Sequence, residues 1–239
     1  MKINLDDGYS FGRGLFETIK VVDKKALFLT RHLIRLNNSL EFFGIDRKIS
    51  EDEVYNFVRS QKNSDYALKL SVSEKNTIYT IRTDPYRLMD KSRMLKLCIS
   101  DVKRNSTSHT VYHKSFNYYD NIIEKRKAKE AGYDEVIFFN ENNFLAEGAV
   151  SNIFFIRDNS LYTPALKTGI LAGTMRDYII SKNDVKEVYL KKYDMKDYEA
   201  CFICNSLMGI LPVGQIDEFE YKENNLVKDL IGKLEKIGF

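Results

Sequence analysis

The 239-residue sequence lacks several features that mark special classes of protein. It has no tryptophan, only three prolines, and no apolar run that approaches the roughly 18 residues of a membrane span. Residues 1–7 contain no apolar core of the signal-peptide kind. Its three cysteines cannot form an even disulfide framework, so we expect a reducing cytoplasm as the location. We therefore expect no membrane partner.

An excess of charge of one sign is also missing. The sequence has 37 basic and 34 acidic residues, and a net charge of +3 is too balanced to predict a nucleic-acid partner. The one basic cluster, residues 125–129, lies in an expected helix and is interpreted as its solvated face. With 44% hydrophobic and 30% charged residues, the composition is that of a folded globular protein. The length suits one large domain or two modest ones.

Cys201 and Cys204 have the CxxC spacing that occurs in zinc and redox sites. The residues between them are Phe202 and Ile203, and the sequence contains no second pair. The setting is typical of a buried strand. We therefore expect these thiols to pack in the core, and we expect no metal.

Hydrophobic periodicity predicts a first half with strands and two helices. Thr30 is the expected N-cap of the first helix, Gly44 its end, and Ser50 the start of the second. A proline and charged residues at 84–87 break the pattern, so the polar stretch that follows is the expected linker. The predicted domains are a small α/β domain at 1–86, a linker at 87–93 and a larger domain at 94–239.

The second half predicts more strands than helices, which makes the fold class α+β or mixed α/β. The expected helices are 120–132, a segment that begins at Gly173, and 226–237. The expected strands across the chain are 15–22, 26–29, 66–73, 77–83, 95–99, 135–139, 153–156, 161–164, 188–190 and 200–203.

Two charged residues within the second half are candidates for chemistry. Lys114 lies in a mixed polar and aromatic segment before a predicted helix, where partial burial would make its amine a usable nucleophile for Schiff-base formation. Glu147 follows apolar residues and precedes small ones, so it is expected to be buried and to need a partner. A structural salt bridge and a contact with a protonated pyridine nitrogen both remain open for this carboxylate.

Three further features are consistent with a phosphate site. Gly173, Thr174 and Met175 open a helix, where free backbone N–H groups and the helix dipole favour an anion. Arg35 could add a charged donor, and Ser206 could add a hydroxyl. Taken separately, each is as typical of an ordinary surface arginine, helix cap or turn serine.

The order of these pieces resembles the fold-type IV pyridoxal-phosphate enzymes, the family of branched-chain aminotransferases, D-amino acid aminotransferases and aminodeoxychorismate lyases. The resemblance implies a two-domain mixed α/β fold, bound pyridoxal 5'-phosphate and a homodimer. It implies that Lys114 is the Schiff-base lysine and that Glu147 is the partner of the pyridine nitrogen. It also implies that Arg35, the backbone of Thr174 and Met175, and Ser206 bind phosphate, with Tyr118 beside the cofactor. The motifs that carry it are FGRGLFE at 11–17, HLIRL at 32–36, KSFNY at 114–118, EGAVSNIF at 147–154 and GTMR at 173–176.

Within this family, residues 204–213 are similar to the lyases, and the Arg-Pro-Leu motif of branched-chain aminotransferases is absent from residues 68–71. The resemblance therefore favours a 4-amino-4-deoxychorismate lyase, which gives 4-aminobenzoate and pyruvate in folate biosynthesis. The alternatives are an aminotransferase of branched-chain or D-amino acids and a non-catalytic protein that binds the cofactor. The candidate groups for the two substrate carboxylates are Lys69, Arg82, Arg87 and Arg13.

Overall fold

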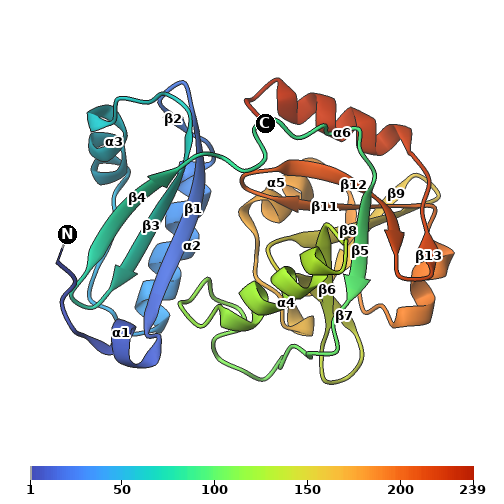
Figure 1. The fold of residues 1–239 in the computed structure, drawn as a ribbon, viewed down its shortest axis with the longest axis horizontal. Coiled ribbons are helices and arrows are strands. Elements are labelled where there is room, and N and C mark those ends of the chain that lie inside the picture. The colour runs from blue at the N-terminus through green and yellow to red at the C-terminus, as the bar shows by residue number, and fades with distance from the viewer. Residues whose placement is uncertain (1) are drawn as a thin grey trace. The chain divides into compact units, whose positions relative to one another are not determined.

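A computed structural model describes residues 2–239, which divide by their internal contacts into two compact units (Figure 1). Unit 1 contains the chain up to residue 89, together with 113–118 and residue 238. Unit 2 contains residues 90–112, 119–237 and 239. The sequence prediction placed all of 94–239 in one domain. By contacts, the segment 113–118 that carries Lys114 belongs instead with the N-terminal residues.

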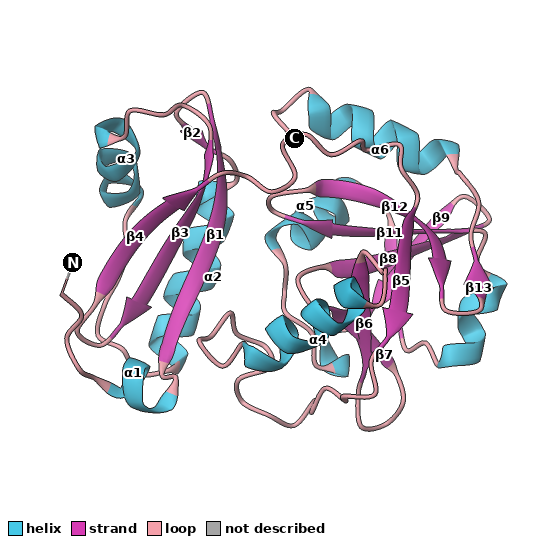
Figure 2. Cartoon of the chain, viewed as in Figure 1, coloured by secondary structure: helices cyan, strands magenta, loops and turns pink. Residues whose placement is uncertain are grey.

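Unit 1 is built on a four-stranded antiparallel sheet in the order β2-β1-β3-β4 (Figure 2). Both longer helices of this unit supply side chains to the core on one face of the sheet. The elements are α1 (Asp7–Phe11), β1 (Gly14–Val22), β2 (Lys25–Ala26), α2 (Leu29–Phe42), α3 (Glu51–Ser60), β3 (Tyr66–Ser73) and β4 (Thr77–Arg82).

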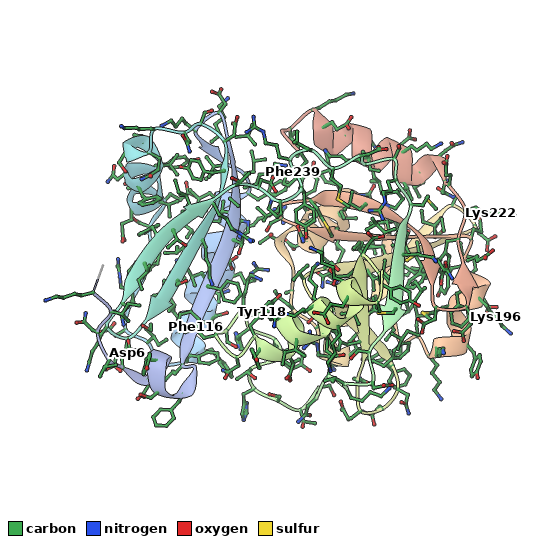
Figure 3. All side chains as sticks on the ribbon, in the orientation of Figure 1. Asp6, Phe116, Tyr118, Lys196, Lys222 and Phe239 are labelled. Carbon is green, nitrogen blue, oxygen red and sulfur yellow. The ribbon has the colours of Figure 1, made fainter. Side chains whose placement is uncertain are left out.

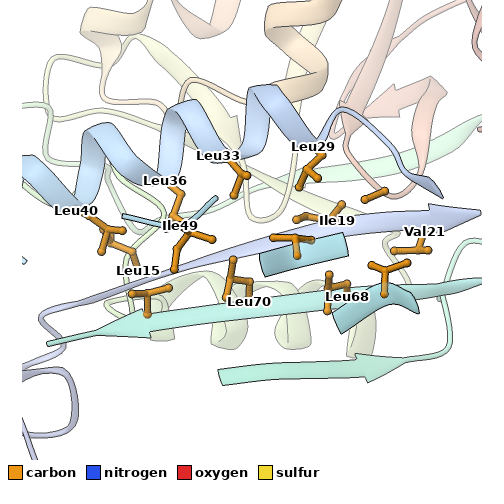
Figure 4. Packing of buried hydrophobic residues seen from close by; sticks show 14 of the residues in the cluster. Leu15, Ile19, Val21, Leu29, Leu33, Leu36, Leu40, Ile49, Leu68 and Leu70 are labelled. Atoms are coloured by element: carbon orange, nitrogen blue, oxygen red, sulfur yellow. The ribbon is translucent and has the colours of Figure 1, made fainter. Parts of the chain in front are cut away.

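Side chains of β1 point alternately to the two faces of the sheet, and this decides which of them contact the helices. Leu15, Ile19 and Val21 are at most 1% exposed and pack against Leu33 and Leu36 of α2 (Figure 4). Because successive side chains of a strand point to opposite faces, the residues between them lie on the other face of the sheet. Unit 1 therefore has one face that is covered by its helices and one that they leave open.

The helix starts in unit 1 were predicted with mixed success. The capping box at Ser50 is confirmed, since its side chain accepts from Glu53 N–H while the Glu53 carboxylate accepts from Ser50 N–H. The prediction of Thr30 as the N-cap of α2 is wrong. Phe28 occupies that position with φ of 54° and no side-chain cap, because the chain reverses there between β2 and α2. Thr30 lies inside the helix and donates to Glu51.

Unit 2 is built on a nine-stranded mixed sheet in the order β10-β9-β8-β11-β12-β5-β6-β7, with β13 paired to β12. Helix α4 packs on β6, α5 on β11 and α6 on β12. The elements are β5 (Leu95–Ile99), α4 (Tyr119–Glu130), β6 (Glu135–Phe139), β7 (Leu145–Gly148), β8 (Asn152–Arg157), β9 (Ser160–Pro164), η1 (Leu166–Thr168), α5 (Thr174–Lys182), β10 (Val185–Val188), η2 (Lys192–Asp197), β11 (Ala200–Asn205), β12 (Gly209–Ile216), β13 (Phe219–Glu220) and α6 (Asn225–Glu235).

The two cysteines with CxxC spacing lie in a central strand, as the apolar pattern predicted. Cys201 and Cys204 are buried in β11 between β8 and β12, and burial raises the pKa of both thiols. Both are free thiols. Among residues 2–239, no group of three or more His, Cys, Asp or Glu side chains could hold a metal ion. No helix in the same part of the chain combines the length and apolar composition that crossing a bilayer requires.

Candidate active site

The segment that carries Lys114 is held against the start of β1 by backbone hydrogen bonds. Phe16 N–H donates to Lys114 O at 2.8 Å, and Phe116 N–H donates to Gly14 O at 2.8 Å. Gly14 is required for this approach, because a Cβ built there would lie 2.3 Å from the Phe116 ring. His113 anchors the other end of the segment. Its Nδ1 lies 2.9 Å from Ser39 Oγ in α2.

The ammonium of Lys114 lies over two aromatic rings. Its Nζ is 4.5 Å from the centroid of Phe16 and 5.1 Å from that of Tyr118, and the two rings meet edge to face at 5.2 Å. Lys114 and Tyr118 are both half-buried, as the sequence predicted for the lysine. Figure 3 shows Tyr118 and Phe116 on this segment. Contact with two ring faces restrains the flexible lysine side chain.

Arg35 lies in the same unit, on α2, but its guanidinium is already engaged by a carboxylate. Its Nε and one terminal nitrogen donate to Glu17 of β1 at 2.8 and 2.5 Å. His32, one turn earlier on α2, contacts the same carboxylate. The positive charge of Lys114 is among the causes that lower the pKa of His32, after burial. Lys114 and Arg35 are therefore both coupled to one charged cluster in unit 1.

Glu147 is the last residue but one of β7 in unit 2, and the structure supplies the partners that its burial requires. Leu171 N–H donates to Oε2 at 3.0 Å, and the Arg104 guanidinium lies 3.6 Å from Oε1. Arg104 also stacks on the Phe138 ring at 4.0 Å and donates to Asn121. A salt bridge, the first of the two readings of Glu147, is therefore present. It fixes the orientation of the carboxylate and leaves the cofactor reading to a functional test.

The start of α5 is joined to Glu147 through a short stretch of chain. Leu171, which donates to Glu147, accepts through its carbonyl from Asn152 Nδ2 at 3.0 Å. Gly173 then serves as the N-cap of α5 without a side-chain cap, so the first-turn N–H groups of Thr174 and Met175 face the helix end. A Cβ on Gly173 would lie 2.0 Å from Asn152 Oδ1. The start of α5 and the buried carboxylate are thus both linked to residue 171 in unit 2.

Ser206 lies in the turn between β11 and β12, which is organised by the residue before it. The Asn205 side-chain oxygen accepts from the N–H groups of Leu207 and Met208, each at 2.9 Å. Its amide donates to Val150 O at 3.0 Å, which ties the turn to the loop after Glu147. Four of the predicted positions, Glu147, Thr174, Met175 and Ser206, therefore lie in one connected part of unit 2.

The structure distinguishes the four candidate groups for substrate carboxylates. Arg13 donates to the Phe43 and Gly44 carbonyls at the C-terminal end of α2, at 2.7 to 3.0 Å, so its donors serve the fold. Lys69 of β3 and Arg82 of β4 lie on the open face of the sheet, and neither forms an ion pair within residues 2–239. Arg87 is an exposed residue of the turn after β4.

Sequence reasoning missed several residues that hold these groups in place. Arg104 lies in a polar loop without periodicity, so no pattern linked it to Glu147. Asn152 and Asn205 were read as parts of motifs and were given no role. The signal that could have identified Glu17 was its place among apolar residues of a predicted strand, because a carboxylate at such a position needs a cationic partner.

Comparison with known proteins agrees with this fold. The mixed sheet with its helices and the small α/β unit match the fold-type IV architecture. A family model described as amino-transferase class IV matches residues 14–216, and the chain belongs to this family.

Individual relatives include both lyases and aminotransferases. An aminodeoxychorismate lyase of Bacillus subtilis is 25% identical, with 90% of this chain and 82% of that protein covered. A D-alanine aminotransferase of Bacillus licheniformis is also 25% identical, with 89% and 82% covered. The crystal structure of a "Putative 4-amino-4-deoxychorismate lyase" from Legionella pneumophila has a TM-score of 0.89 at 29% identity, with 99% of this chain and 95% of that chain covered.

The residues present fit the cofactor that fold-type IV implies. Pyridoxal phosphate requires an amine for its aldehyde, an acid for its ring nitrogen and donors for its phosphate. Unit 1 offers the Lys114 amine and Arg35, and unit 2 offers Glu147 and an α5 start with no side-chain cap. Two buried nitrogens of Arg104, Nε and NH2, have no hydrogen-bond acceptor in the described residues although one lies beside Glu147. Each unit, taken by itself, therefore carries residue types that this group needs.

Proposed function

We propose that this chain is a pyridoxal-phosphate-dependent 4-amino-4-deoxychorismate lyase that forms 4-aminobenzoate and pyruvate. In this proposal Lys114 holds the cofactor through its amine, and Glu147 faces the ring nitrogen. Arg35, the backbone of Thr174 and Met175, and Ser206 hold the phosphate. The family membership supports a cofactor-dependent enzyme, and the resemblance also implies a homodimer.

The observation that favours the lyase is the basic group around Phe16 on the open face of the unit 1 sheet. Lys69 Nζ lies 4.7 Å from the Phe16 centroid, and Lys114 Nζ lies 4.5 Å from the same ring. Partial burial and the nearby charge of Arg82 lower the pKa of Lys69. With Lys114 assigned to the cofactor, Lys69 and Arg82 remain as two cationic groups near the Phe16 ring, which suits a flat substrate with two carboxylates. A branched-chain amino acid has one carboxylate and an apolar side chain.

Each step assigned to this chain uses a group whose position is described above. Bound pyridoxal phosphate supplies an electron sink next to the carbon that bears the substrate amine. The amine of Lys114 takes the proton from that carbon as general base. Phe16 and Tyr118 hold Lys114 Nζ in place both when it binds the cofactor and when it takes the proton. Arg104 and the Leu171 N–H group hold Glu147 in a fixed orientation. The bond between the neighbouring ring carbon and the enolpyruvyl oxygen then breaks, so that pyruvate leaves as its enol and takes up a proton to become the keto acid. Aromatisation of the ring drives the reaction.

The decisive experiment measures 4-aminobenzoate formation by cofactor-loaded protein that is given aminodeoxychorismate and no 2-oxo acid. We expect steady product formation by the wild type and none by Lys114→Ala, because no other amine replaces the nucleophile and base. Lys129→Ala, which removes an exposed lysine of α4, should retain activity. Product formation by Lys114→Ala would contradict the role of this lysine.

Lys69→Met tests the substrate side of the same proposal. Losing a charge-assisted contact of about 1.5–3 kcal/mol should raise KM for aminodeoxychorismate roughly 10- to 100-fold. We expect kcat to change much less, because Lys69 would bind the substrate and the transition state alike. Initial-rate kinetics separate the two constants. An unchanged KM would remove Lys69 from the substrate site and leave Arg82 and Arg87 as candidates.

An aminotransferase of D-amino or branched-chain amino acids is the second candidate, favoured by the likeness to the Bacillus licheniformis D-alanine aminotransferase. Transamination needs a 2-oxo acid as acceptor, whereas the lyase reaction does not. Protein that binds the cofactor, forms no 4-aminobenzoate and transfers the amino group of D-alanine or leucine to a 2-oxo acid would establish this alternative.

A further inference from the structure

Glu17, His32 and Arg35 form a charged network inside the hydrophobic core of unit 1. Glu17 is 1% exposed and His32 is 0% exposed, and both lie among the apolar side chains that join β1 to α2. The Glu17 carboxylate accepts from Arg35 Nε at 2.8 Å and from an Arg35 terminal nitrogen at 2.5 Å. Its Oε2 also lies 2.7 Å from His32 Nδ1. Every described contact of this carboxylate is therefore with α2.

The sequence builds this network by placing one carboxylate on the helix-facing side of β1. Glu17 takes the same alternation as Leu15 and Ile19, so it points into the core. His32 and Arg35 are three residues apart on α2, which brings both to the same side of the helix. Burial would raise the pKa of Glu17, but the charge of Arg35, aided by His32, lowers it to about 2. The carboxylate is thus ionised at neutral pH.

His32 serves the network as a neutral donor. Burial lowers the pKa of His32 in spite of the adjacent carboxylate. The neutral imidazole then carries its proton on Nδ1, where it donates to Glu17, and its buried Nε2 has no hydrogen-bond partner in the described structure. A histidine in this state adds no charge. It holds the carboxylate by a hydrogen bond from within the core.

We propose that Glu17, braced by His32, is the positioning residue that orients the Arg35 guanidinium for the phosphate group of the ligand. This inference rests on the proposed function, in which Arg35 binds the phosphate of pyridoxal phosphate. A planar guanidinium that is held along one edge by two hydrogen bonds can present its remaining donors in only one direction. The ordering of a long, flexible side chain is then complete before the ligand arrives, which increases affinity.

The competing explanation is a salt bridge that only stabilises the fold. Buried ion pairs are weak contributors to stability, because desolvation offsets much of their attraction. A hydrophobic pair at positions 17 and 35 would fill the core between β1 and α2 without this cost. The two explanations differ in one measurable respect. Only the positioning role makes the affinity for phosphate depend on the length of the side chain at position 17.

The test compares two substitutions that separate geometry from charge. Glu17→Asp keeps the charge and withdraws the carboxylate by one methylene, whereas Glu17→Gln keeps the length and removes the charge. The readouts are the Kd for pyridoxal phosphate from its absorbance change and the concentration of inorganic phosphate that competes with it. We expect Glu17→Asp to raise the Kd about tenfold, or about 1.4 kcal/mol. Glu17→Gln should also raise it, because its amide turns a donor toward Arg35 or His32.

A double variant, in which Glu17→Asp is added to Arg35→Lys, tests whether Glu17 acts through Arg35. Arg35→Lys keeps the positive charge beside Glu17 but loses the two-sided planar fork. If Glu17 acts by orienting that fork, adding Glu17→Asp to Arg35→Lys should change the Kd less than about twofold, as strong coupling in a double-mutant cycle requires. Glu53→Asp is the matched control, since Glu53 pairs with Arg47 in the same unit. It should leave the Kd unchanged.

The outcomes distinguish the inference from the function on which it rests. Wild-type protein that takes up pyridoxal phosphate, weakened by Arg35→Lys but not by Glu17→Asp or Glu17→Gln, would overturn the inference and leave the function standing. So would variants that melt at a lower temperature yet bind with the wild-type Kd. Wild-type protein that takes up no pyridoxal phosphate would overturn the proposed function and the inference with it.

Discussion

At the scale of single residues, Asp6 shows how one carboxylate can fasten the beginning of the chain (Figure 3). It accepts from the Ser73 hydroxyl at 2.7 Å, from Lys75 N–H and the Asn76 amide at 2.9 Å each, and from Tyr9 N–H at 3.2 Å. Burial would raise its pKa, but these donors outweigh burial and lower it to about 2. The turn between β3 and β4 is therefore tied to α1 through one ionised side chain.

Asp6→Asn should destabilise unit 1 in a manner that depends on pH. Because the folded-state pKa is lowered, the stabilisation by Asp6 is fully present above about pH 4 and is lost as the pH falls toward 2. We expect a loss on the order of 2 kcal/mol at neutral pH, since hydrogen bonds to a charged acceptor are replaced by weaker ones. Urea unfolding at about pH 7 and about pH 3 measures the difference. A gap between the two proteins that does not shrink at the lower pH would exclude this account.

The candidate site could be predicted from sequence only where a residue type at a motif position carries its own chemistry. Lys114, Glu147 and the start of α5 at Gly173 were proposed in this way, and their roles at a cofactor stay predictions. Arg104 could not be found, because its pairing with Glu147 joins a polar loop to a distant strand end and leaves no periodic pattern. Arg13 and Lys69 were equal candidates for a substrate carboxylate, and only tertiary contacts show that Arg13 donates to backbone carbonyls of Phe43 and Gly44.

At the scale of elements, Gly173 illustrates a position fixed by close packing. Its backbone is not in the left-handed region, so the requirement for glycine comes from the 2.0 Å approach of Asn152 Oδ1 to a would-be Cβ. Asn152 in turn donates to the Leu171 carbonyl, whose own amide donates to Glu147. A side chain at residue 173 must therefore displace the start of α5 or the support of Glu147.

Gly173→Ala should lower both stability and cofactor affinity. Overpacking of this kind typically costs about 1–3 kcal/mol, and a shifted α5 start should weaken binding of pyridoxal phosphate. Gly232→Ala is the matched control, because a Cβ there meets nothing within 4 Å and α6 gains a better helix former. It should raise the melting temperature slightly without affecting binding. Wild-type affinity in Gly173→Ala would show that α5 does not need its present start.

Element prediction succeeded where the apolar pattern was continuous and failed where the signals conflicted. Buried strands such as β6 appear in the structure at the predicted residues, 135–139. Strand β12 (Gly209–Ile216) was missed, since Pro212 and Gly214 both argue against a central strand. A register shift against β5 falls at Gly214, between Val213 and Gln215, while Pro212 lies opposite Phe202 in the regular pairing of β12 with β11. The short α1 was missed because five residues give no periodicity.

At the scale of the whole molecule, the sequence predicted the fold class and the family. It did not predict which segments share a unit. The prediction assigned residues by their order along the chain, whereas packing assigns 113–118 to unit 1 and the residues on both sides to unit 2. Periodicity identifies helices and strands, but it carries no information on a segment that leaves one unit and packs in the other. Here the packing of residues 113–118 in unit 1 depends on Gly14, which lets the Phe116 ring approach β1.

The placement of the lysine segment has a consequence for how the protein is made and inherited. During synthesis, all strands of the unit 1 sheet are complete once residue 82 has been added. The unit gains the segment beside Phe16 only after residue 118 has been synthesised. A gene fragment that ends near residue 89 would encode the sheet of the small unit without Lys114. The segment with Lys114 is thus encoded apart from the sheet that holds it, so the small unit is complete only when both parts of the chain are present.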